Sequence, residues 1–154
     1  MSGQQETRPR IVVGVDGSEP SRDALRWAVT QAGLTGAGVE AVLAWHHPYL
    51  AAGYGWAPLA VMQASDFAAD AEKLVTDVVS SVVDPATAVP VTARAVQGRP
   101  PRVLLDAARG AQLLVVGSRG LGGFTEALLG SVSQHCVHHA PCPVVIIREQ
   151  AAVS

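Results

Sequence analysis

A spaced set of glycines in the last third of the chain is the pattern best suited to chemistry. Gly117 and Gly120 follow the short apolar run 113–116, and Gly130 and Ser131 come after nine further residues. Such a run indicates a strand buried on both faces. Where a strand passes through glycines into a helix, the first helical N–H groups lack partners and the helix dipole is positive. The segment therefore predicts an anion site, most often one for phosphate.

A short helix is expected to begin at Ser131, because Ser131 and Gln134 have the S-x-x-Q spacing of a capping box. Glycines before this helix would let a ligand approach the amides and would allow left-handed backbone angles. The structural alternative is that Gly117 and Gly120 only form a strand-to-helix turn.

The composition indicates one α/β domain. The chain has 154 residues, of which 49% are hydrophobic and 16% charged, enough for a sizeable core. We expect residues 1–9 to form a flexible N-terminal tail rather than a signal peptide, residues 10–149 a single domain, and residues 150–154 a C-terminal tail.

The charge and the cysteine count narrow the classes of partner. The net charge is -2 and the basic residues do not cluster, so we expect no nucleic-acid partner. No stretch approaches the roughly 18 apolar residues of a membrane span. Two cysteines, Cys136 and Cys142, are too few for a disulfide framework, which favours reduced thiols and a cytoplasmic location.

Strand and helix patterns alternate along the chain. The first apolar strand ends at Asp16, and Ser18 is expected to cap a helix whose apolar stripe ends at Gly33 and Gly36. The further expected elements are a strand at 39–45, a helix at 59–83, a strand at 90–96 near a sheet edge, a helix at 103–108 and a strand at 143–148. This alternation predicts the α/β class, with an open five-stranded parallel sheet and helices on both faces.

The order of the strands decides where a ligand would bind. If the order is 3-2-1-4-5, it reverses between the first strand and the strand at 113–116, which would bring Asp16 beside Gly117. Asp16 either caps the first helix or contacts the ligand. The loop at 46–58 is either an exposed connection or a cover for the site.

The G-x2-G-x9-G-[ST] pattern that starts at Gly117 resembles the nucleotide motif of the universal stress protein family. The first strand, 12–18, resembles the opening strand of that family with its terminal aspartate, and 140–148 resembles its closing strand. The resemblance covers roughly 10–148. It implies a Rossmann-like, adenine nucleotide alpha-hydrolase-like fold with the strand order 3-2-1-4-5.

The resemblance to the ATP-binding branch of this family also implies roles for individual residues. The implied nucleotide-binding positions are Gly14, Val15, Asp16, Ala44, Gly117, Arg119, Gly120, Gly130, Ser131 and Val132. Asp16 would face the ribose or a bound Mg²⁺, and Ser131 would donate to phosphate through its hydroxyl and backbone N–H. The backbone of Ala44 would meet the adenine. No catalytic set of nucleophile, base and acid stands out.

This reading predicts an ATP-binding regulatory or sensing module that acts in the stress response. Two alternatives stay open, a slow ATPase or self-phosphorylating enzyme and a nucleotide-free interaction protein. The chain lacks the G-x-x-x-x-G-K-[ST] loop of P-loop enzymes. The apolar run Val144–Ile147 would form a sheet edge and predicts an antiparallel homodimer, an assembly common in the family.

Three histidines form a second candidate site. His135, His138 and His139 share a helical face beside Cys136 and Cys142. A zinc site is conceivable, but the spacing matches neither C-x2-C nor H-E-x-x-H. Histidines on a half-exposed helix are the simpler interpretation.

Overall fold

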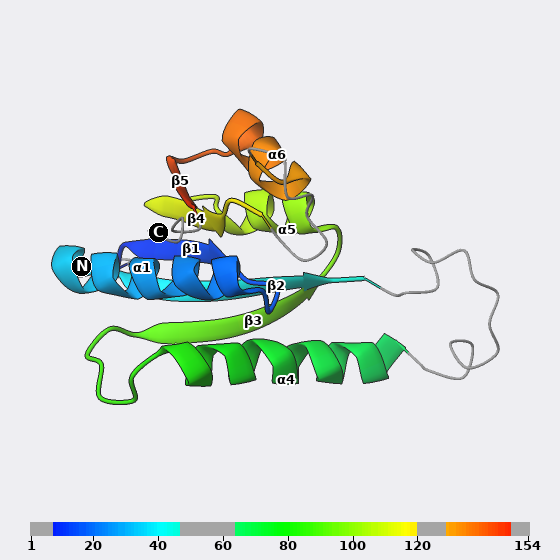
Figure 1. Cartoon of the computed structure of the whole chain (residues 1–154), viewed down its shortest axis with the longest axis horizontal. Coiled ribbons are helices and arrows are strands. Elements are labelled where there is room, and N and C mark those ends of the chain that lie inside the picture. The colour runs from blue at the N-terminus through cyan, green and yellow to red at the C-terminus, as the bar shows by residue number, and fades with distance from the viewer. Residues whose placement is uncertain (1–7, 47–63, 120–128, 149–154) are drawn as a thin grey trace, which may run out of the picture.

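The computed structural model describes residues 8–46, 64–119 and 129–148. In chain order the elements are β1 (Arg10–Gly14), α1 (Glu19–Thr35), β2 (Gly38–Trp45), α4 (Ala64–Val82), β3 (Val91–Gln97), α5 (Pro100–Ala107), β4 (Leu113–Gly117), α6 (Ser131–His139) and β5 (Val144–Ile147) (Figure 1). The strands form one parallel sheet in the order β3-β2-β1-β4-β5, which confirms the predicted fold class. Of the loop predicted at 46–58, all but His46 lies outside the described residues.

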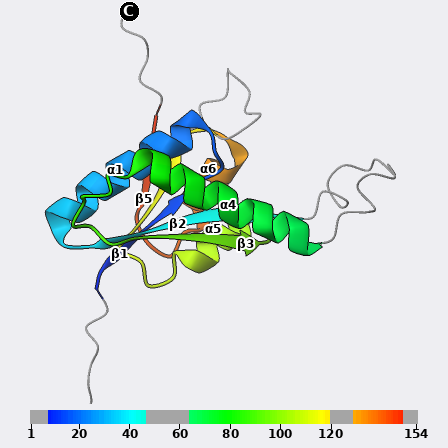
Figure 2. The ribbon, with the colours of Figure 1, turned by 90° about the horizontal axis from the view of Figure 1, so that it is seen from below.

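Two helical layers enclose the sheet. Figure 2 shows α1 and α4 crossing one face, and α5 and α6 lie on the other. On the first side, Leu25 of α1 and Val75 of α4 are fully buried in one hydrophobic cluster with Val13 of β1. On the second side, Leu104 of α5 and Cys136 of α6 are buried in another. Each central strand therefore contributes apolar side chains to both faces, as expected for a parallel sheet.

Two helices have boundaries that differ from the sequence-based expectation. Helix α1 continues through Gly33 and is ended by Gly36 alone, which has φ 75° and donates its N–H to Ala32. Helix α5 begins at Pro100 instead of Val103, since prolines fit the first helical turn, where no N–H partner is needed.

Helix α6 begins at Ser131 as predicted, but the expected capping box is wrong. The N-cap is Gly130, and no side chain caps the helix. Gln134 is therefore not part of a capping pair, and its side-chain amide contacts the carbonyl of Leu129 at 3.4 Å.

The two sheet edges differ. Strand β3 is an edge strand, as predicted, and the Glu72 side chain of α4 accepts a hydrogen bond from the N–H of Ala95 at 3.3 Å. Strand β5 forms the opposite edge, and its four residues are half-buried. Among the helices of the described ranges, none combines the length and the apolar character that a bilayer span requires.

Candidate functional site

The carboxyl ends of β1 and β4 meet at one edge of the sheet. These strands pair in parallel, with Ile11 opposite Leu113 and Val13 opposite Val115. Chain segments leaving them turn to opposite faces, because α1 covers one face and α6 the other. The strand order thus reverses here, where open α/β sheets bind ligands. Gly117 is the last residue of β4 and Asp16 lies two residues after the end of β1, so the structure brings them to the same edge.

Backbone hydrogen bonds fix the two ends of the segment that joins β4 to α6. The N–H of Ser118 donates to the carbonyl of Ile147 at 2.9 Å, and the N–H of Gly130 donates to the carbonyl of Ser118 at 2.7 Å. Ser118 is buried. The start of α6 is therefore held directly against the end of β4.

Ser133 holds α6 against the end of β4 through hydrogen bonds. The sequence analysis did not identify this residue. Its hydroxyl donates to the carbonyl of Gly117 at 2.6 Å and lies 3.3 Å from the carbonyl of Ser118. The side chain is only 3% exposed. A signal was available, since Ser133 and Cys136 are three residues apart and share the buried face of α6.

The first amides of α6 are available to an anion. In the described part of the chain, no acceptor reaches the N–H of Ser131 or Val132, and no side chain caps the helix. The Ser131 side chain is exposed. By contrast, the N–H of Gly130 already donates to the carbonyl of Ser118. This predicted site residue therefore cannot offer its amide to a ligand unless that hydrogen bond breaks. The amides of Ser131 and Val132 therefore form an uncapped, positively polarised helix end.

The nearby N-terminus of α1 is capped by the side chain of Ser18. Ser18 is the N-cap, and its hydroxyl oxygen accepts from the N–H of Ser21 at 3.4 Å. Asp16 Oδ1 accepts from the N–H of Ser18 at 2.9 Å and from the Ser18 hydroxyl at 2.5 Å. Asp16 is therefore not the cap of α1 itself but orients the N-cap residue Ser18, and its contact with a ligand stays a prediction.

Gly117 is required by the packing of α1 against β4, independently of any ligand. A Cβ atom at this position would lie 2.9 Å from the carbonyl carbon of Pro20 in the first turn of α1. At Gly14, a Cβ atom would lie 2.8 Å from Cδ1 of Leu104, a flexible side-chain end on α5. Both glycines therefore allow helices to approach the ends of central strands closely.

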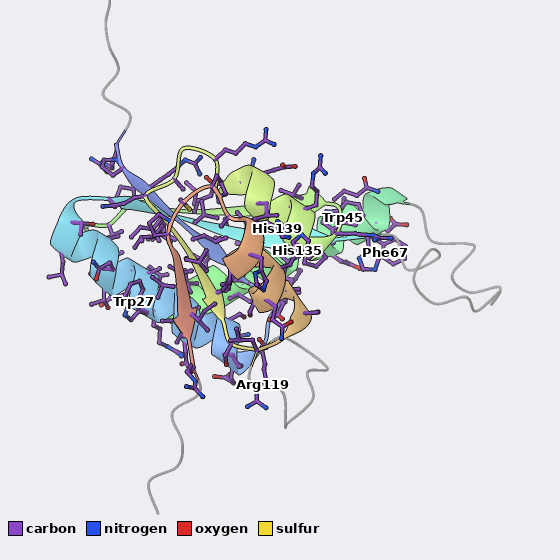
Figure 3. All side chains as sticks on the ribbon, turned by 90° about the horizontal axis from the view of Figure 1, so that it is seen from above. Trp27, Trp45, Phe67, Arg119, His135 and His139 are labelled. Atoms are coloured by element: carbon purple, nitrogen blue, oxygen red, sulfur yellow. The ribbon has the colours of Figure 1, made fainter. Side chains whose placement is uncertain are left out.

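The remaining predicted positions that the structure describes lie at or near the same edge. Val15 is buried, and its N–H donates to the carbonyl of Val42 at 2.9 Å. Ala44 is half-buried near the end of β2, opposite Val96 of β3. Figure 3 shows Arg119 projecting outward just after β4. Gly120 lies outside the described residues.

The two thiols are poorly suited to nucleophilic chemistry. Burial raises the pKa of Cys136 above its ordinary value of 9.0 to about 11. Burial also raises the pKa of Cys142, and the positive charge of Arg10 opposes this effect. Both side chains are free cysteines, and at neutral pH the thiolate form that a nucleophile needs is scarce.

Comparison with known proteins gives consistent matches over most of the chain. The family model described as the universal stress protein family matches residues 7–148. The chain is similar to a universal stress protein of Mycolicibacterium smegmatis, with 33% identity over 97% of this chain and 52% of that protein. It spans about half the length of the curated relatives it matches.

Two solved structures of similar fold contain adenine nucleotides. One is a universal stress protein in complex with cAMP, with a TM-score of 0.62 and 26% identity over 93% of this chain and 98% of that one. The other is the universal stress protein from Archaeoglobus fulgidus in complex with dAMP, with a TM-score of 0.63 and 23% identity over 91% of this chain and 97% of that one. The second likeness is evidence for the fold alone.

Proposed function

This chain belongs to the universal stress protein family, and we propose that it binds ATP at the carboxyl edge of its sheet and acts as a regulatory module. The observation that carries the proposal is the uncapped start of α6. Its Ser131 and Val132 amides have no acceptor in the described part of the chain, and they stand at the edge where the strand order reverses. A phosphate group would supply the missing acceptor.

In this proposal, different residues at or near the carboxyl edge of the sheet bind the phosphates, the ribose and the base of the nucleotide. The Ser131 hydroxyl and the amides of Ser131 and Val132 would bind phosphate oxygens, and Arg119 would add a positive charge. The capped turn at Asp16 would lie toward the ribose, and the backbone near Ala44 toward the base. A Mg²⁺ ion bound with ATP would supply charge neutralisation for the phosphates. The similar structure of a universal stress protein in complex with cAMP supports an adenine nucleotide as the ligand class.

Regulation would follow from a difference in affinity between two states. ATP can shift the conformation or the partner choice of the protein only by binding one state more tightly than the other. Helix α6 is suited to such coupling, because Ser133 and Gly130 tie its first turn to the end of β4. A change at the phosphate site would therefore be transmitted to the end of β4 and to its neighbour, the edge strand β5.

The test is a calorimetric titration of ATP, AMP and cyclic AMP, each with Mg²⁺, against wild type and two Ser131 variants. Ser131→Asp places a negative charge at the start of α6, which favours the helix but repels phosphate. We expect it to lower ATP affinity by about tenfold or more, since a charge-assisted hydrogen bond contributes about 1.5–3 kcal/mol. Ser131→Asn is the neutral control and is expected to lose only a few-fold.

The result that overturns the proposal is absence of saturable adenine-nucleotide binding in folded wild type. Equal affinity of Ser131→Asp and wild type would place the phosphate elsewhere. Turnover of labelled ATP by the pure protein then separates the regulatory module from a slow ATPase.

We also propose that two copies pair through β5. The N–H of Leu114 donates to the carbonyl of Pro143, and the N–H of Ser118 donates to that of Ile147. Strand alternation then directs the backbone polar groups of Val144 and Ile146 away from β4, where a second copy could meet them. The opposite edge is less open to pairing, because Glu72 already accepts the N–H of Ala95.

A further inference from the structure

Two histidines stand one helical turn apart on α6, C-terminal to the proposed phosphate-binding residues Ser131 and Val132. The ring centroids of His135 and His139 are 4.6 Å apart, and the ring planes are tilted by 44° (Figure 3). Both side chains are exposed. Residues four apart lie on the same face of a helix, so the backbone itself keeps the two imidazoles together. We propose that His135 and His139 chelate one divalent late transition-metal ion.

The distance between the rings fits this role. A metal ion lies about 2.0 Å from a coordinating imidazole nitrogen, and therefore about 3 Å from the ring centroid. Two imidazoles in adjacent coordination positions, at about 90° to one another, then have centroids about 4.5 Å apart. The observed 4.6 Å matches this spacing without movement of the helix. The third histidine is less well placed, since the centroids of His138 and His139 are 6.3 Å apart.

The composition of the site selects the ion. Within the described ranges, no group of three or more His, Cys, Asp or Glu side chains could hold a metal, so water would complete the coordination of a two-histidine site. Cys136 sits between the histidines in sequence, but it is fully buried. Imidazole ligands favour Cu²⁺, Ni²⁺ and Zn²⁺, and Cu²⁺ binds most tightly in this series. The site is therefore an exposed, exchangeable Cu²⁺ site that also accepts Ni²⁺ and Zn²⁺ more weakly.

The experiment uses the full chain without a histidine tag, in a buffer that does not coordinate metals. Cu²⁺, Ni²⁺ and Zn²⁺ are titrated separately into wild type, His135→Gln, His139→Gln and the matched control His138→Gln. We expect one Cu²⁺ per chain in wild type. Either chelating variant should lose about tenfold or more in affinity, while the control stays within about twofold of wild type.

A second measurement identifies the ligands directly. Electron paramagnetic resonance of the Cu²⁺ complex should show coupling to two imidazole nitrogens in wild type and in His138→Gln, and not in the two chelating variants. Circular dichroism confirms that all four proteins are folded. Equal Cu²⁺ affinity in all four, or an equal loss in His138→Gln, would overturn the assignment.

Discussion

Gly117 at the end of β4 lies against the backbone of Pro20 in the first turn of α1. A Cβ atom on Gly117 would be 2.9 Å from the carbonyl carbon and the Cβ of Pro20, and 3.0 Å from its carbonyl oxygen. Real Cβ atoms essentially never approach other atoms this closely, and a helix backbone cannot rotate away as a side chain can. Gly117 thus joins the packing of the sheet to the proposed nucleotide site.

Gly117→Ala is expected to destabilise the fold by about 2 kcal/mol, because overpacking against a rigid neighbour costs about 1–3 kcal/mol. Gly33→Ala is the matched control. Its Cβ would meet only Val89 Cγ2 at an ordinary 3.6 Å inside α1, and it should stabilise the helix by roughly 0.5–1 kcal/mol. Urea denaturation of both variants checks this. An undiminished free energy of unfolding in Gly117→Ala would show that α1 yields easily, and loss of nucleotide binding in that variant would then report on the site.

Ser133→Ala is expected to cost about 1–3 kcal/mol, because it removes a buried hydroxyl and leaves the Gly117 carbonyl without this donor. It should also weaken nucleotide binding, since the first turn of α6 loses its tie to β4. Ser131→Ala, an exposed change two residues earlier, should alter stability by no more than about 0.5 kcal/mol. Denaturation and calorimetric titration are run on both. Unchanged ATP affinity in a destabilised Ser133→Ala would restrict this serine to a structural role.

The Cys136 thiol makes stability depend on pH in the alkaline range. Its pKa is raised by burial to about 11 in the folded state, so below pH 9.0 the thiol is neutral whether the chain is folded or not. Above pH 9.0 the unfolded chain loses this proton and the folded chain keeps it, so stability falls by up to about 1.4 kcal/mol per pH unit until about pH 11. Urea denaturation at several pH values should show a shallower alkaline loss in Cys136→Ala. Equal slopes in the two proteins would contradict this assignment.

Ile146→Pro tests the proposed pairing of two β5 strands. Proline removes the N–H of Ile146, which we expect to point away from β4 toward a second copy. Ile146→Ala makes a comparable loss of side chain but keeps that N–H. Multi-angle light scattering at micromolar concentration should find wild type and Ile146→Ala dimeric and the proline variant monomeric. A monomeric wild type, or a dimeric and folded Ile146→Pro, would exclude this interface.

Sequence patterns were sufficient for the elements and their class. Alternating apolar runs and helical stripes predicted five strands and a parallel sheet, and the resemblance supplied the confirmed order β3-β2-β1-β4-β5. Such features depend on neighbours within one or two turns of chain, where periodicity is informative. Even so, local sequence signals gave wrong predictions at the ends of two helices. Ser131 and Gln134 have the spacing of a capping box, yet Gly130 is the N-cap. Gly33 predicts a helix end, yet α1 passes through it.

The sequence by itself determined which residues could gather at the carboxyl edge, because parallel strands must all end there. Only the tertiary structure decided which of their polar groups are already occupied. It binds the amide of Gly130 to Ser118, binds the carboxylate of Asp16 to the N-cap residue Ser18, and ties α6 to β4 through Ser133. These contacts join segments up to 16 residues apart, as from Gly117 to Ser133. Their partners are fixed by the packing of α1 and α6 on opposite faces of the sheet, which no local pattern encodes.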